Sequence, residues 1–168
     1  MSSRDWVLLV LNVLCTAISV YGAYKSIRYY KKSRYVEIHA NLFRALDLVG
    51  SMLRRLPDVL VEHQNRRRRG VNPAQTVRSI GKELIDTLNS VVECIPSDYL
   101  HEFCDLLKDG KDFDLSAFLN SLTDGSGFCE EDGMILINRY QYDLCLKRLR
   151  VMQEFLKKKE NESVESLK

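Results

Sequence analysis

Residues of the types that bind zinc lie in the second half of the sequence: Cys94, His101, Cys104 and Cys129. Thiolate and imidazole groups are the ligands that zinc prefers, and the step from His101 to Cys104 places both on one face of a helix. The other spacings match no zinc finger or ribbon, because such motifs bring their ligands in close pairs. We therefore expect reduced, buried thiols and a surface histidine here, and no metal site.

A cysteine nucleophile is the second chemistry that these residue types suggest. It needs a histidine within hydrogen-bonding distance and a third group that orients the histidine. His39, His63 and His101 are scattered along the chain, and no glycine-rich turn lies near them. The sequence thus predicts no catalytic residue, no cofactor and no enzymatic activity.

Residues 105–112, DLLKDGKD, resemble a calcium-binding loop with Gly110 at its sixth position. Leu107 and Ser116 would then stand where such a loop needs an oxygen ligand and a bidentate glutamate. We expect no calcium site.

Four consecutive arginines form the strongest short motif: Arg66, Arg67, Arg68 and Arg69. Such a run attracts anionic lipid, an acidic protein surface or nucleic acid, and it also occurs in solvated linkers. Nucleic acid is disfavoured because no aromatic side chains alternate with these arginines to stack on bases. Residues 66–72 are therefore expected to be a linker that offers a contact for an anionic partner.

An uncharged apolar run, residues 6–24, precedes all of these groups. Its 19 residues would form a helix about 28 Å long, which matches the hydrocarbon thickness of a bilayer. Tryptophan at one edge and tyrosines at the other suit the headgroup level. The sequence predicts a transmembrane helix whose anchoring residues are Trp6, Leu9, Leu11, Val13, Ile18, Tyr21 and Tyr24.

Two alternatives remain for this run. A cleaved signal peptide would have a basic start, a shorter apolar run and small residues just before its cleavage site. The best candidate cleavage site here follows Ala23, and the large residue Tyr21 would occupy its −3 position. A buried core helix is the other alternative, because Asn12, Thr16 and Ser19 lower the hydrophobicity. The same three residues lie on one helical face, which favours self-association in lipid.

Cations follow the apolar run closely, whereas Arg4 alone precedes it. Because the positive flank stays in the cytoplasm, residues 1–5 should lie outside and the C-terminal part in the cytosol. Each cation near anionic headgroups contributes about 1 kcal/mol of attraction. The predicted headgroup contacts are Lys25, Arg28, Lys31, Lys32 and Arg34.

The charge is divided along the chain. Residues 25–69 carry twelve Lys or Arg against four acids, a net +8, whereas residues 70–168 have a net charge of −6. Residues 98–132 alone carry ten acids and two lysines. This acidic stretch is either a solvated surface or a docking face, for a basic partner or for the chain's own basic half.

Apolar residues at steps of three and four predict helices throughout the rest. We expect basic amphipathic helices over residues 25–65, with Pro57 starting a new helical turn, and a helical domain over 73–159. Its helices should run from an Asn72 cap to residue 95, from a Ser97 cap to Gly110, over 115–122 behind Asp114, and from 130 to 159. The run 134–137 could be a strand, but its surroundings favour helix. Residues 160–168 should be a frayed polar tail.

The expected fold is all-α, a single membrane helix followed by a cytosolic bundle of four to six helices. This layout recurs among receptors of the mitochondrial outer membrane and adaptors of the endoplasmic reticulum, so an intracellular membrane is expected. We expect an interaction protein that recruits or scaffolds a protein partner at the membrane surface. The alternative is a self-assembling membrane-remodelling or pore-forming protein, acting as a homo-oligomer through its N-terminal helices.

Overall fold

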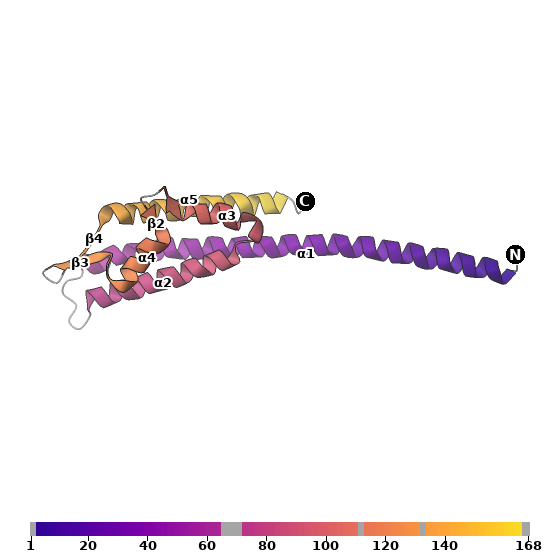
Figure 1. Cartoon of the computed structure of the whole chain (residues 1–168), viewed down its shortest axis with the longest axis horizontal. Coiled ribbons are helices and arrows are strands. Elements are labelled where there is room, and N and C mark those ends of the chain that lie inside the picture. Colours follow the sequence, from indigo (N-terminus) through magenta and orange to yellow (C-terminus); the bar gives the residue numbers. More distant parts are fainter. Residues whose placement is uncertain (1–2, 65–71, 111–112, 132–133, 166–168) are drawn as a thin grey trace.

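The computed structural model describes residues 3–64, 72–110, 113–131 and 134–165 (Figure 1). Within these ranges the chain is predominantly α-helical, as the sequence predicts, with five helices and two short antiparallel strand pairs. In chain order the elements are α1 Ser3–Gln64, α2 Pro73–Cys94, α3 Ser97–Leu106, β1 Lys108–Asp109, β2 Phe113–Asp114, α4 Leu115–Asp124, β3 Phe128–Glu131, β4 Met134–Ile137 and α5 Arg139–Glu165.

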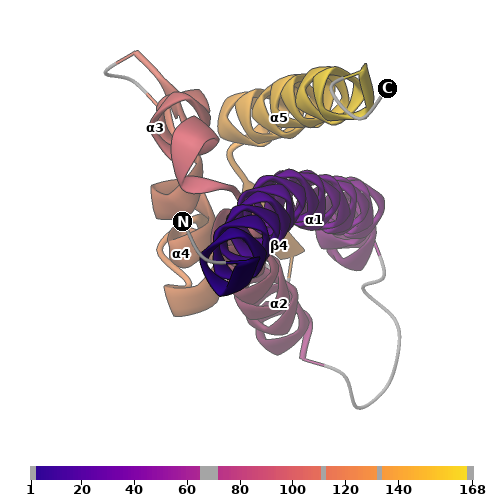
Figure 2. The same cartoon turned by 90° about the vertical axis from the view of Figure 1, so that its right-hand side faces the viewer.

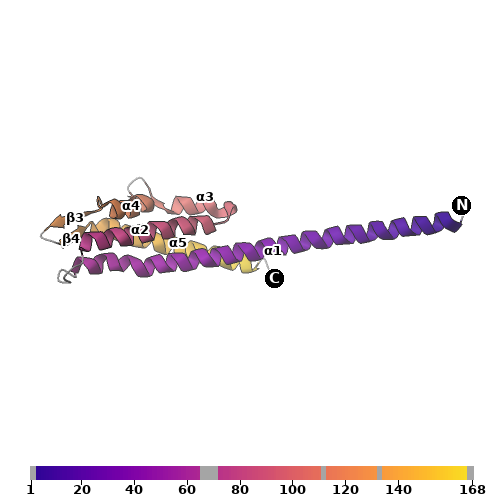
Figure 3. The same cartoon turned by 90° about the horizontal axis from the view of Figure 1, so that it is seen from below.

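Helix α1 is a long rod whose two halves have different surroundings. Its second half packs against α2 and α5, and α4 packs on α2 (Figure 3). Its first half projects beyond the bundle, and the N-terminus lies at the far end of this projection (Figure 1). The second half of α1 is therefore a core element of the bundle, and the first half is an extension of it.

The core consists of apolar residues that recur every three or four positions on three helices, which is the spacing that keeps side chains on one helical face. On α1 these residues are fully or almost fully buried from Leu42 to Val59. The largest buried side chains of the other elements are Ile80, Leu84, Leu88, Phe103, Leu115, Leu119, Leu122, Ile135 and Leu149.

Two predicted helix caps are confirmed. The Asn72 side-chain oxygen accepts a hydrogen bond from the Ala74 backbone N–H at 3.0 Å, with Pro73 in the first turn of α2. The Asp114 carboxylate accepts one from the Ala117 N–H at 3.1 Å and starts α4. Each side chain satisfies a backbone donor that a helix N-terminus leaves unpaired.

Pro57 does not start a new helix; it lies inside α1. Its neighbours Leu56 and Val59 are both completely buried, so the core contact continues on either side of the proline. Arg55 also donates to Asp58 at 2.6 Å and to Glu83 of α2 at 3.0 Å. Packing and these ion pairs keep the helix continuous where a proline alone favours a break.

The residues predicted to cap the start of α3 and to close its end do neither. Ser97 is the first residue of α3 rather than its cap, and the capping position is Pro96, whose side chain makes no hydrogen bond there. Gly110 does not close the helix, because α3 already ends at Leu106. Instead Gly110, with φ +63°, lies in the turn between β1 and β2. Glycine suits that turn because a positive φ carries no Cβ penalty.

The region from Phe128 to Ile137 is a hairpin, not the start of the last helix. β3 and β4 pair antiparallel, with Phe128 opposite Ile137 and Cys129 opposite Leu136. Ile135 is buried whereas Leu136 is exposed, so this strand alternates between core and solvent. The sequence does not show this alternation, because all four residues of the run 134–137 are apolar.

Helix α5 begins at Arg139 and reaches Glu165, so part of the predicted polar tail is helical. The Asn138 side chain caps its start by accepting from the backbone N–H groups of Tyr140 and Gln141. Near its end, Ser163 is buried against α1. This contact explains why the helix continues through a polar sequence.

Candidate membrane anchor and basic collar

The first half of α1 is the candidate anchor. Each side chain described from Trp6 to Glu37 is exposed, and none of the most apolar window of this helix is buried. Large apolar side chains between Trp6 and Tyr24 are 49–69% exposed. Of the described helices, α1 is the one that is long and apolar enough to cross a membrane.

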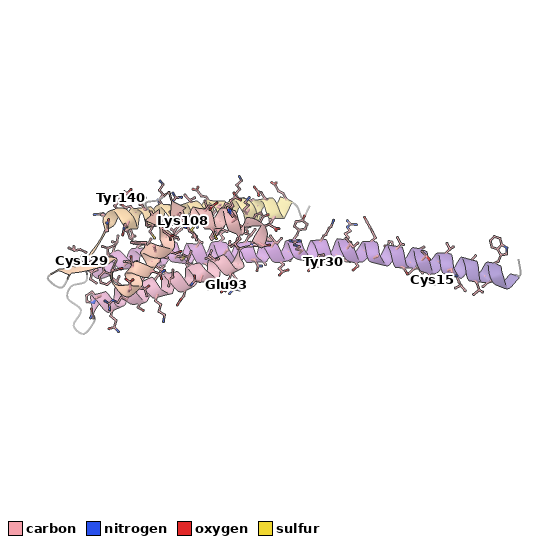
Figure 4. All side chains as sticks on the ribbon, in the orientation of Figure 1. Cys15, Tyr30, Glu93, Lys108, Cys129 and Tyr140 are labelled. Atoms are coloured by element: carbon pink, nitrogen blue, oxygen red, sulfur yellow. The ribbon has the colours of Figure 1, made fainter. Side chains whose placement is uncertain are left out.

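The predicted anchoring residues all lie on this projecting stretch of α1, where Cys15 marks its middle (Figure 4). Those whose exposure is described are solvent-facing, namely Trp6, Leu11, Val13, Ile18, Tyr21 and Tyr24, and Leu9 belongs to the same stretch. Soluble proteins rarely leave so large a continuous apolar surface uncovered. The stretch is therefore compatible with a membrane anchor.

The predicted collar follows directly on the same helix, around Tyr30 (Figure 4). The Lys25 ammonium lies 5.9 Å from the ring centroids of both Tyr21 and Tyr29, within the range of a cation–π contact. Arg34 lies 3.6 Å from Asp98. In the described part of the chain the other collar cations have no ion-pair partner; these are Lys25, Arg28, Lys31 and Lys32.

An exposed stretch of α1, Lys25 to Glu37, separates the anchor from the bundle. Its 13 residues span about 20 Å of helix. Burial begins at Ile38 and is complete at Leu42. Since no helix break intervenes, the orientation of the bundle is tied to that of the anchor.

A polar cluster closes the bundle where α1 enters it, and sequence reasoning missed it. His39 Nδ1 lies 3.3 Å from the Ser163 hydroxyl, which itself donates to the Glu160 carbonyl. Lys159 lies 3.2 Å from Glu102 and 4.9 Å from the Tyr99 ring centroid, which joins α5 to α3. The sequence did contain a signal for this contact, because Ser163 lies two helical turns after Leu156 and so on the same buried face of α5.

The candidate zinc ligands are dispersed. Cys94 is buried at the end of α2, His101 is exposed beside Asp105, and Cys129 is exposed on β3 at the other end of the bundle (Figure 4). Among the residues that the structure describes, no three His, Cys, Asp or Glu side chains are grouped to hold a metal ion.

The most deeply buried thiol is Cys145 of α5. Burial raises its pKa from 9.0 to about 12, so the thiol keeps its proton at neutral pH. Only the thiolate is strongly nucleophilic, and the Cys145 side chain therefore acts as a small apolar group in the core.

The four arginines Arg66 to Arg69 lie outside the described residues. The end of α1 and the start of α2, which flank these arginines in the sequence, lie at the end of the bundle opposite the anchor (Figure 1). The acidic stretch 98–132 meets the collar through Asp98, which pairs with Arg34.

Comparison of the chain with protein-family models, with curated proteins and with solved structures finds no match in any of the three.

Proposed function

We propose that the chain is a single-pass membrane protein that presents its helical bundle to a protein partner at the cytosolic face of an intracellular membrane. One observation carries the proposal: α1 is a single helix whose second half forms the bundle core and whose first half is apolar and uncovered. A bilayer is the environment that would cover the first half while leaving the bundle in water.

The energetics favour insertion. Nine Val, Leu or Ile side chains lie between Trp6 and Tyr24. Each contributes about −0.3 to −0.6 kcal/mol to insertion at the centre of a membrane helix, so their total gain is at most about 4 kcal/mol, which Asn12, Thr16 and Ser19 reduce. The collar cations add attraction to anionic headgroups at the cytosolic surface.

Orientation follows from the same collar. Five Lys or Arg residues lie within the ten residues after Tyr24, and a flank of this kind is retained in the cytosol. The bundle is then cytosolic, and the short N-terminus lies across the membrane. The mitochondrial outer membrane and the endoplasmic reticulum are the two locations that we propose for this arrangement.

Display of a binding surface is the role that suits such a layout. The described residues form a packed bundle tied to one long helix, which holds surfaces of α2, α3 and α5 at a fixed height above the bilayer. We therefore propose an adaptor rather than an enzyme.

Alkaline extraction of the full chain tests the anchorage. We expect the wild type to stay in the membrane pellet and the double variant Leu11→Arg with Ile18→Arg to move to the supernatant. Each arginine costs about 3 kcal/mol near the bilayer centre, which outweighs the apolar gain. The matched control places two arginines outside the span, Leu136→Arg with Tyr140→Arg, and should stay in the pellet.

Protease protection of a C-terminally tagged chain in intact organelles tests the orientation. A cytosolic bundle loses its tag on protease treatment without detergent. A protected tag would contradict the proposed topology, and release of the wild type by alkali would contradict the anchor itself.

A further inference from the structure

We propose that the chain forms a parallel homodimer through one face of α1 that runs from the membrane span into the bundle. The inference rests on the proposed anchorage, because a shared bilayer aligns the two copies. We name this face the α1 seam. Its residues are Leu8, Asn12, Cys15, Ser19, Gly22, Ser26, Tyr29, Ser33, Val36, Ala40 and Phe43.

The seam follows a heptad repeat. Its residues are separated by alternating steps of four and three from Leu8 to Phe43, which is the pattern that keeps one face of a helix against a partner helix in a left-handed coiled coil. After Asn12, one set of seam positions is small (Ser19, Ser26, Ser33 and Ala40), so two helices can approach closely.

Charge singles out this face from the others. Between Leu8 and Phe43 neither of the two seam positions of the heptad holds a charged residue, although the collar crosses this stretch. Each of the other five heptad positions holds at least one charged residue. One example from each position is given by Lys25, Arg28, Lys31, Arg34 and Glu37. The collar thus surrounds the seam without interrupting it.

The seam lies on the side of α1 that the bundle does not use. Ile38, Leu42 and Ala45 face the core, whereas Val36 and Phe43 are 52% and 59% exposed. Figure 2, which looks along α1, shows the other helices leaving one side of α1 open. Phe43 is beyond the span, so lipid cannot cover it, whereas a second copy can.

Inside the span, Asn12 gives the seam a reason to pair. No hydrogen bond to its side-chain amide is found in the described part of the chain, and an unpaired amide in hydrocarbon is costly. Asn12 of one copy can pair with Asn12 of the other. Thr16, predicted to share this role, donates its hydroxyl to the Asn12 carbonyl at 2.8 Å and lies beside the seam.

Gly22 gives a second indication within the span. A Cβ added to Gly22 would meet no atom within 4 Å, and its φ is not positive. The chain itself therefore has no steric need for glycine there. Close approach of a second backbone would supply that need.

Charge complementarity favours a second copy in parallel orientation. Lys32 and Glu37 flank the seam on opposite sides, at the two positions that pair between strands of a parallel coiled coil. Neither has an ion-pair partner among the described residues. In the dimer Lys32 of each copy would pair with Glu37 of the other.

The seam ends after Phe43. The next position is Asp47, whose carboxylate lies 3.9 Å from Arg54 on the same helix. Two Asp47 carboxylates across the axis would repel each other, so the helices diverge there. The bundles of the two copies are then held on the outside of the dimer.

Cysteine crosslinking of the full chain in vesicles of anionic and neutral phospholipid tests the face. We compare Ser33→Cys on the seam with Lys31→Cys on the opposite face, both with Cys15→Ala and Cys129→Ala. Mild oxidation should link Ser33→Cys into a disulfide dimer at least about tenfold faster than Lys31→Cys, because only the seam brings the two thiols within disulfide distance. Equal rates would overturn the proposal.

Charge reversal tests the partner and the orientation. Lys32→Glu or Glu37→Lys alone should weaken the dimer about tenfold, because each turns two attractions into two repulsions. The double variant should restore dimerisation, and Lys157→Glu, the same reversal at an exposed position of α5 outside the collar, should leave it unchanged. A double variant that stays as weak as the single ones would overturn the parallel pairing.

Gly22→Leu should abolish the dimer, whereas Ala17→Leu, the same kind of enlargement on the opposite face, should not. Photobleaching of labelled chains in vesicles should show two steps per spot; more steps would overturn a dimer and favour a pore. Every variant is also tested by alkaline extraction. A chain that stays in the pellet as a monomer overturns the seam alone, and one that leaves the pellet overturns the anchor.

Discussion

The Arg34 guanidinium lies 3.6 Å from the Asp98 carboxylate, so the last cation of the collar contacts the first acid of the 98–132 stretch. The side chains are 58% and 60% exposed. An ion pair as exposed as this one contributes about 0–1 kcal/mol, because water screens it. The contact positions the two groups, but it is too weak to hold the collar away from a membrane.

Asp98→Ala should therefore change little. We expect a shift in Tm of less than about 3 °C and unchanged binding to anionic vesicles at physiological salt. Thermal unfolding of the full chain in detergent and vesicle flotation measure these quantities, with Asp105→Ala as the control for loss of an acid. A clear rise in vesicle binding for Asp98→Ala alone would show that the pair does restrain the collar.

Leu42→Ala should destabilise the bundle by about 3 kcal/mol, because it removes a fully buried side chain and leaves a cavity. Leu136→Ala removes the same atoms from a side chain that is 41% exposed and should cost less than about 1 kcal/mol. Denaturant unfolding of the full chain in detergent measures the difference. Similar costs would mean that α1 is not a core element.

Two glycines in helices should respond oppositely to alanine. A Cβ at Gly81 would lie 2.9 Å from Leu122 Cβ and 3.0 Å from the Thr123 backbone N, so Gly81→Ala should force α2 and α4 apart at a cost of about 1–3 kcal/mol. At Gly50 the Cβ meets only the Arg54 guanidinium, at 3.8 Å, and Gly50→Ala should stabilise by about 0.5–1 kcal/mol. Thermal unfolding of the two variants should show a lower Tm for Gly81→Ala and a higher Tm for Gly50→Ala.

Stability should fall between pH 9 and 12 partly because of Cys145. Its pKa is about 12 in the fold and 9.0 without burial, so the unfolded chain loses this proton first as the pH rises. The free energy of unfolding is therefore unaffected by this group below pH 9. Above pH 9 it falls by up to about 1.4 kcal/mol per pH unit. Unfolding at pH 8 and pH 10 should show a smaller decline for Cys145→Val than for the wild type.

Much of the helical architecture could be predicted from periodicity and capping chemistry. Asn72 and Asp114 are side chains whose capping role depends on their immediate neighbours, and both predictions are confirmed. The errors arose where tertiary packing decides. Pro57 remains helical because Leu56 and Val59 are buried against other elements, and a sequence window does not contain those contacts.

The strand Met134–Ile137 and the contact of His39 with Ser163 were missed for a related reason. A four-residue apolar run fits both helix and strand, and its hairpin partner decides between them. The serine at position 163 was assigned to the tail because its neighbours are polar, yet it is buried where α5 meets α1. Of the three residues predicted from the sequence to mediate self-association, Asn12 and Ser19 belong to the proposed seam, whereas Thr16 lies beside it.

Continuity of α1 makes it a molecular ruler. The 40 residues from Lys25 to Gln64 span about 60 Å, or about 46 Å in height even at a 40° tilt. Electrostatic attraction to headgroups fades within about 8 Å at physiological salt, so in the proposed orientation the tip of the bundle would lie too far from the bilayer to bind a lipid of the same leaflet. The length of α1 would instead set the distance from the bilayer at which the tip of the bundle binds a partner, such as one carried by a second membrane.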